Sequence, residues 1–124
     1  MYVVGTGDRH KVEARILVER LIVAGEKLVT DAEVLQEILH RYTTINRREA
    51  INEAFSFIAG VVDEIFPMEK KDLLRASEIV RAPAQWSARD AVHIAVMERR
   101  GVKTILSFDA DFDKWPGLRR IHHI

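Results

Sequence analysis

The chain has 124 residues, of which 48% are hydrophobic, which is enough for one domain to bury its own core. Basic and acidic residues number 19 each, so no overall field attracts nucleic acid, and any binding to RNA or DNA would depend on local patches. The absence of cysteine excludes disulfides and thiolate metal sites, and no apolar run is long enough to span a membrane. Without a visible secretory signal, we expect a soluble, cytoplasmic protein.

The first half of the chain alternates helical and strand patterns. Apolar residues recur every three or four positions in the helical segments, and short apolar runs separate them. We expect a helix over about residues 10–24, a strand at 27–30, a helix that opens at 30–33, a helix over about 48–59 closed by Gly60, and a strand within 61–66.

The second half is organised around one helix, and the sequence has a capping signal at each of its ends. Ser87 is placed as its N-cap and Gly101 as its C-terminal stop. Apolar residues occupy most of the circumference of this helix, which is typical of a buried helix. Around it we expect a helix over about residues 70–81, a strand at 104–107 that leads to Asp109, and an edge strand at 118–122.

Strands that alternate with helices predict an α/β fold with a parallel sheet, because parallel strands need crossover connections. Ligands of such sheets bind at the carboxyl ends of the strands. Three acidic residues, Glu33, Asp90 and Asp109, fall at that rim in the expected element order. Carboxylates gathered there would repel one another, and a bound Mg²⁺ or Mn²⁺ would remove the repulsion.

Each of these residues also has a purely structural interpretation. Thr30-x-x-Glu33 forms a capping box, and Ser87-x-x-Asp90 forms a looser one, so both acids could simply satisfy backbone N–H groups. The acidic run that starts at Asp109 could be a solvated turn. A histidine inside the apolar helix, His93, fits a packed core residue better than a ligand.

Three segments together resemble the acidic motifs of PIN domains, and specifically of VapC-type toxins from toxin–antitoxin pairs. They are Thr30-Asp-Ala-Glu-Val-Leu-Gln-Glu-Ile-Leu-His-Arg-Tyr42, Ser87-Ala-Arg-Asp-Ala-Val-His93 and Ile105-Leu-Ser-Phe-Asp-Ala-Asp-Phe-Asp113. The resemblance covers nearly the whole chain. It implies a PIN-like three-layer sandwich with a parallel sheet flanked by helices, and an endoribonuclease that depends on Mg²⁺ or Mn²⁺. It also implies an RNA substrate, a small antitoxin partner and a homodimer.

The resemblance assigns roles by position. Glu33 matches the second family acid, Asp90 the third and Asp109 the fourth, and these three are the expected catalytic and metal-binding residues. Asp111 is an expected auxiliary metal ligand, and Ser107 is the expected supporting hydroxyl.

The start of the chain departs from the family pattern, whose first acid ends an opening strand in an Asp-x-Asn motif. Met1–Gly5 resembles the segment after that motif, so we expect residues 1–124 to form a single domain that lacks the family's first, central strand. A rival alignment lays Val4-Gly-Thr-Gly7 over the motif, with glycines in place of both Asp and Asn. Either alignment leaves one acid absent, so a catalytically inactive PIN module that binds an antitoxin or RNA is the alternative to an enzyme.

Overall fold

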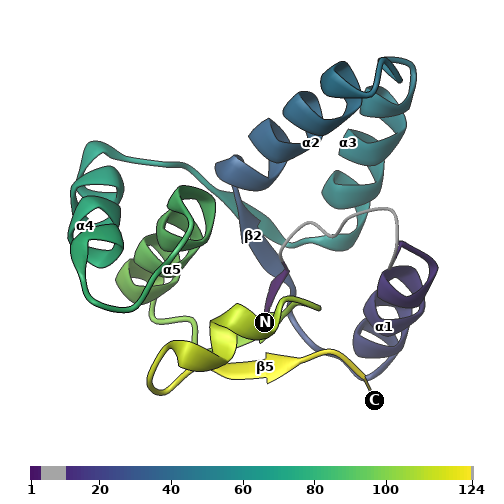
Figure 1. Cartoon of the computed structure of the whole chain (residues 1–124). Helices are drawn as coiled ribbons and strands as arrows, with labels where there is room; N and C mark the ends of the chain where they lie inside the picture. Colours follow the sequence, from purple (N-terminus) through teal and green to yellow (C-terminus); the bar gives the residue numbers. More distant parts are fainter. Residues whose placement is uncertain (4–10, 124) are drawn as a thin grey trace.

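The computed structural model describes residues 1–3 and 11–123 (Figure 1). The strands are β1 (Tyr2–Val3), β2 (Val29–Asp31), β3 (Glu64–Phe66), β4 (Thr104–Leu106) and β5 (Arg119–Ile121). The helices are α1 (Lys11–Val23), α2 (Ala32–Thr44), α3 (Ala50–Val61), α4 (Lys70–Arg81), α5 (Ala88–Arg100) and the 3₁₀ helix η2 (Ala110–Lys114).

The strands form one parallel sheet in the order β3-β2-β1-β4-β5. Helical segments connect successive strands, as parallel pairing requires, and chain order and spatial order differ. The α/β class and the parallel sheet predicted from the sequence are therefore confirmed. All five carboxyl ends lie at one edge of the sheet, and that edge precedes the starts of α2 and η2.

The centre of the sheet differs from the expectation of a missing central strand. Tyr2–Val3 occupies that position, with Tyr2 opposite Val29 on one side and Ile105 on the other. The side chain of Tyr2 is fully buried, so even a two-residue strand is fixed there by ladders on both edges and by packing. The rival placement of the first motif at residues 4–7 falls outside the residues that the structure describes.

Two separate apolar clusters show that helices cover both faces of the sheet (Figure 1). On one face, α4 and α5 pack against strand residues such as Phe66 and Ile105. On the other face, α1 packs against Leu28 and Leu106, with Phe57 of α3 alongside. This is the helix, sheet, helix sandwich that the sequence predicts. The pair α2 and α3 stands up from the carboxyl edge of the sheet as a helical hairpin.

The ends of α5 are those that the sequence predicts. The Ser87 hydroxyl accepts a hydrogen bond from the Asp90 backbone N–H, and Gly101 takes the left-handed conformation with φ of 69°. The expected stop at Gly60 is wrong, since α3 continues to Val61. Within the described ranges, no helix combines the length and apolar character that crossing a membrane requires.

Candidate metal centre

The junction of β2 and α2 places the first predicted acid. The strand runs one residue further than predicted, so Asp31, rather than Thr30, caps α2, and its Oδ1 accepts a hydrogen bond of 3.2 Å from the Val34 backbone N–H. The capping box expected for Thr30 and Glu33 is therefore wrong, because Thr30 still belongs to β2. Glu33 therefore has no part in a capping box with Thr30, and it is 8% exposed in the first turn of α2.

The loop after β4 places the predicted hydroxyl and two more acids. Ser107 is buried, and its Oγ accepts a hydrogen bond of 3.1 Å from the Asp109 backbone N–H. Asp109 in turn caps η2, since its Oδ1 accepts a 2.9 Å bond from the backbone N–H of Asp111. Ser107 thus supports the turn that carries both acids.

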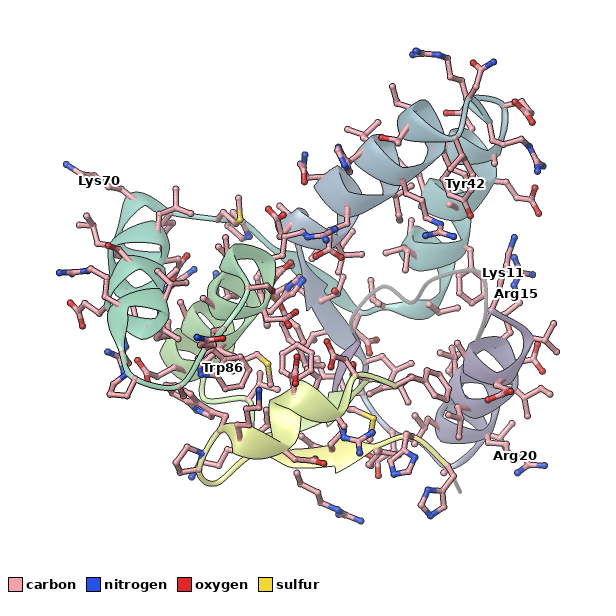
Figure 2. The ribbon with its side chains drawn as sticks, in the orientation of Figure 1. Lys11, Arg15, Arg20, Tyr42, Lys70 and Trp86 are labelled. Atoms are coloured by element: carbon pink, nitrogen blue, oxygen red, sulfur yellow. The ribbon has the colours of Figure 1, made fainter. Side chains whose placement is uncertain are left out.

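Behind this turn, aromatic packing holds η2 against the molecule. Phe112 of η2 is buried, and its ring centroid lies 6.1 Å from that of Trp86. Trp86, labelled in Figure 2, also meets Trp115 edge to face. Trp86 thus joins Phe112 of η2 and Trp115 in one aromatic group beside the acidic loop.

Three carboxylates converge where the start of α5 meets this loop. Asp90, Asp109 and Asp111 each offer an oxygen, and these three oxygens all lie within 4.8 Å of one another. Asp90 is partly buried, whereas the other two are exposed, so the group is open to solvent on one side. Three hard oxygen donors at this spacing fit a Mg²⁺ or Mn²⁺ ion better than a soft metal.

The charges around Asp90 show the cost of this arrangement. Burial, followed by the negative charge of Asp109, raises the pKa of the Asp90 carboxyl. Glu37 on α2 adds to the same repulsion, and His93 opposes it. A cation at the cluster would relieve the strain among these acids and favour their ionised forms.

Glu33 is the predicted ligand that the structure does not bring into the cluster. Burial, followed by the charge of Glu37, raises the pKa of Glu33. Its other electrostatic partners are His93, Asp31 and Arg89, and the three-carboxylate group does not include it. Of the four predicted metal ligands, the structure gathers Asp90, Asp109 and Asp111.

Glu37 is the acid of α2 whose charge acts on Asp90, although it stands outside the three-carboxylate group, and the acidic motifs did not single it out. It stands one helical turn after Glu33, on the same face of α2, and its side chain is 16% exposed. The signal was present in the sequence, because residues at i and i+4 share a helix face and either could reach the rim. Motif position alone favoured Glu33.

A buried histidine ties α5 to this part of α2. His93 has no exposed surface, and its Nδ1 lies 2.7 Å from Oδ2 of Asp31 while its Nε2 lies 2.9 Å from Oε1 of Glu37. The Tyr2 hydroxyl lies 3.1 Å from the same Nδ1. The prediction of a core histidine is confirmed as to burial, but its neighbours include two acids rather than apolar side chains alone.

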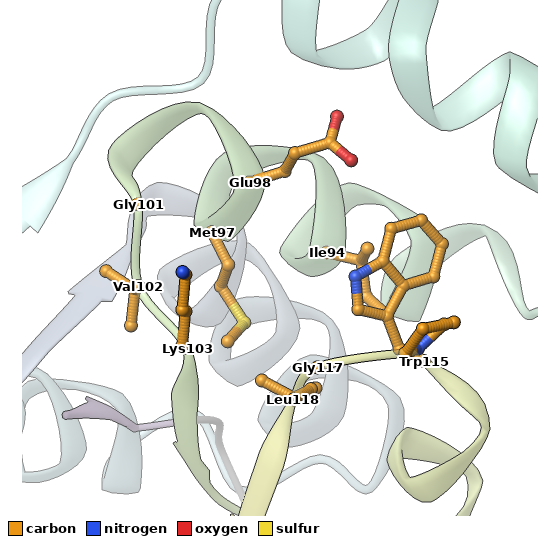
Figure 3. Close-up of a pocket in the computed structure, with 10 residues that line it drawn as sticks. Ile94, Met97, Glu98, Gly101, Val102, Lys103, Trp115, Gly117 and Leu118 are labelled. Carbon is orange, nitrogen blue, oxygen red and sulfur yellow. The ribbon is translucent and has the colours of Figure 1, made fainter.

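A cavity of about 320 Å³ lies at the other end of α5 (Figure 3). Met97, Val102, Trp115 and Leu118 supply most of its apolar wall. Its one acid, Glu98, is held by Arg75 at 2.8 Å. The cavity is therefore an apolar hollow beside β4 and β5, separate from the acidic cluster at the start of the helix.

Comparison with known proteins agrees with this fold. Residues 1–118 match the PIN domain. Ribonuclease VapC13 of Mycobacterium tuberculosis is 50% identical over 98% of this chain and 92% of its own length. The crystal structure of VapC20 from the same organism, a sarcin-ricin loop cleaving toxin, has a TM-score of 0.67 over 90% of this chain and 92% of its own, at 24% identity. VapBC2 of Rickettsia felis, solved bound to a promoter DNA fragment, has a TM-score of 0.73 at 14% identity, covering 97% of this chain and 96% of its own.

The chain belongs to the PIN-domain family. Within it, the curated relatives that match almost end to end carry the VapC name. The resemblance read from the three acidic motifs is thereby confirmed.

Proposed function

We propose that this protein is a metal-dependent endoribonuclease, the toxin of a toxin–antitoxin pair, which hydrolyses phosphodiester bonds of RNA. The observation that carries the proposal is the convergence of Asp90, Asp109 and Asp111 within 4.8 Å on a PIN fold. The names of the relatives support it, because those that match this chain over most of its length are called ribonucleases.

The proposed ion is Mg²⁺ or Mn²⁺, held by Asp90, Asp109 and Asp111. We add Glu37 as the acid from α2, because its charge acts on Asp90, and we keep Glu33 as the alternative that motif position favours. When bound, such an ion supplies Lewis acidity, which lowers the pKa of an attacking water and neutralises charge on the phosphate. An ion of this kind would also let a polyanion approach a cluster that is otherwise negative.

The chain's own residues would fix the geometry of this chemistry. Ser107 holds the backbone at Asp109, so the turn that carries two of the acids does not have to form when substrate arrives. Arg120 closes the same turn from the side of β5, with a 2.9 Å bond to Asp113 and a 3.3 Å bond to the Ser107 carbonyl. A preorganised acidic loop is what an ion with strict coordination geometry needs.

The second candidate is a PIN module that binds its partners without cutting RNA. The observation in its favour is in the sequence, where Gly5 and Gly7 stand at the positions that one alignment gives to the family's first Asp and Asn. A site with one anion fewer repays less of the dehydration cost of the ion and binds it more weakly.

The proposed partners are an RNA substrate, a small antitoxin and a second copy of the chain, in the cytoplasm. Structural neighbours include toxin–antitoxin complexes, among them VapBC from Salmonella typhimurium bound to DNA. The chain has apolar surface to offer to protein partners, since large apolar side chains on α1 and α4 are exposed, such as Val12 at 71% and Leu74 at 58%.

A cleavage assay with Asp90→Asn tests the proposal. The amide keeps the size of the side chain but loses the charge that helps to hold the ion, so we expect RNA cleavage to fall at least about 100-fold and Mn²⁺ affinity to fall with it. Glu98→Gln is the matched control, because it removes one acid from the far end of the same helix and should leave cleavage unchanged. Cleavage that persists in EDTA and in the Asp90→Asn variant would overturn the ribonuclease assignment, and Mn²⁺ binding without any cleavage would favour the inactive module.

A further inference from the structure

The buried ring of His93 is held between two acids from the same neighbouring segment. Asp31, at the end of β2, lies at one nitrogen, and Glu37, in the second turn of α2, lies at the other. Asp31 and His93 have no exposed side-chain surface, and Glu37 is only 16% exposed. Burying polar groups is unfavourable unless each has a hydrogen-bond partner, and a buried network whose members are all paired is rigid.

The chemistry of the three groups fixes the direction of the bonds. Where a ring nitrogen of His93 carries a proton, that N–H donates to the carboxylate that faces it, to Asp31 from Nδ1 and to Glu37 from Nε2. Burial alone would lower the pKa of His93, but the bonds to Asp31 and Glu37 outweigh it and raise the pKa to about 10. Both carboxylates thus lie within hydrogen-bond distance of one ring, at its two nitrogens.

The bridge and the acidic cluster share helix α5. Asp90 precedes His93 by three residues on α5, so the two side chains lie on the same side of that helix. Holding Glu37 to His93 therefore keeps the acid of α2 near Asp90, whose electrostatic surroundings include both residues. Within the described residues, Oε1 of Glu37 bonds to His93 and Oε2 makes no hydrogen bond, so one carboxylate oxygen stays available.

The other end of the bridge is anchored in the fold. Oδ2 of Asp31 takes the His93 bond, while its Oδ1 accepts from Val34 at the start of α2. The Tyr2 hydroxyl adds a contact from the central strand, and its ring meets that of His93 edge to face at 5.9 Å. The ring thus has little freedom to turn, and its orientation sets that of the Glu37 carboxylate.

We propose that His93 is a positioning residue of the metal centre: it holds one oxygen of Glu37 and thereby presents the other to the ion bound by Asp90, Asp109 and Asp111. This inference rests on the proposed function for the presence of the ion. It assigns to His93 no contact with substrate or ion, and the effect passes through Glu37 alone.

Two substitutions at this position separate positioning from general support of the core. The side-chain amide nitrogen of asparagine stands close to where Nδ1 of histidine stands, and that of glutamine close to Nε2. His93→Asn therefore keeps the donor to Asp31 and loses the one to Glu37, while His93→Gln does the reverse. We expect His93→Asn to weaken Mn²⁺ binding about 10-fold or more and His93→Gln to weaken it less than about 3-fold.

Mn²⁺ dissociation constants, measured on the whole chain by titration with electron paramagnetic resonance, are the readout, and circular dichroism verifies folding. Adding His93→Asn to Glu37→Gln should produce no further loss, because the positioned group is already gone. Ile94→Val is the matched control, a buried change on the same helix that should leave Mn²⁺ affinity unchanged. Equal losses in the Asn and Gln variants, or an additive loss on top of Glu37→Gln, would overturn the inference.

A measurement on the unaltered chain does not depend on the folding of any variant. Nitrogen-15 NMR should resolve the two ring nitrogens of His93, and addition of Mg²⁺ should shift the Nε2 resonance more than the Nδ1 resonance. Equal or absent shifts in a chain that binds Mg²⁺ would overturn the inference, as would the absence of Mg²⁺ and Mn²⁺ binding. A chain that binds Mn²⁺, follows the expected variant pattern and cuts no RNA would overturn only the proposed function.

Discussion

At the scale of single residues, two acids of α2 compete for one role. Glu33 matches the family motif by position, but its electrostatic neighbours are Glu37, His93, Asp31 and Arg89. Glu37 acts on Asp90 and is held by the buried histidine. Residues one turn apart lie on the same face of a helix, so either Glu33 or Glu37 could reach the site. Position in the motif alone does not decide which of the two binds the ion.

Paired substitutions of these acids measure the difference. We expect Glu37→Gln to weaken Mn²⁺ binding about 10-fold, because it removes a charge from the group of acids around Asp90, and Glu33→Gln to weaken it less than about 3-fold. Isothermal titration of both variants with Mn²⁺ provides the comparison, and each is the control of the other. A larger loss in Glu33→Gln would return the role to the residue that the motif favours.

At the scale of elements, α4 and α5 are joined by a buried ion pair. Asp72 of α4 is 1% exposed, and Arg99 of α5 binds both of its oxygens, with Nε at 2.6 Å from Oδ1 and an Nη at 2.8 Å from Oδ2. Oδ2 also accepts a 2.9 Å bond from the Glu69 backbone N–H, so the same carboxylate caps α4. These bonds fix the helix that carries Asp90 and His93 against its neighbour.

The pair makes stability depend on pH in a direction that can be stated. The Arg99 bond, which outweighs burial, lowers the pKa of Asp72, so its contribution is present above the unfolded pKa of about 3.9 and is lost as pH falls through the folded pKa. Asp72→Asn should cost about 2 kcal/mol at pH 7 and less as the pH approaches 3. Urea unfolding from pH 3 to pH 7 measures this, with the exposed Glu78→Gln as control. A constant difference across that range would contradict the assignment.

At the scale of the whole molecule, periodicity and caps predict most of the fold. The bounds of α5 follow from Ser87, Gly101 and the apolar spacing between them, all of which are local signals. The central strand is different. Two residues, Tyr2 and Val3, carry too little pattern to predict a strand, and their place depends on β2 and β4, which are distant in sequence.

The candidate site also has a part that local sequence predicts and a part that it does not. Asp109, Asp111 and Ser107 lie in one loop, so their proximity follows from the sequence, and the parallel sheet brings Asp90 to them. The role proposed for Glu37 depends on a bridge to a residue 56 positions away, which no local pattern encodes. The cap at Asp31 was missed because the end of a strand and the start of a helix compete for the same residues.

The oligomeric state of the protein can be predicted from its exposed apolar side chains. We expect a homodimer, with a particle mass twice the 14.2 kDa of the chain, and we place the pairing face on α4 because apolar side chains there are exposed. Leu73 is 49% exposed, Leu74 58% and Val80 39%, and pairing two copies would remove these side chains from water. Light scattering at micromolar concentration should give the dimer mass, and Leu74→Asp should give the monomer, because a charge would be buried at the interface.

Val12→Asp on α1 is the control and should stay dimeric, since it lies on the opposite face of the sheet. A monomeric wild type would contradict the dimer, and a dimeric Leu74→Asp variant would exclude α4 as its interface.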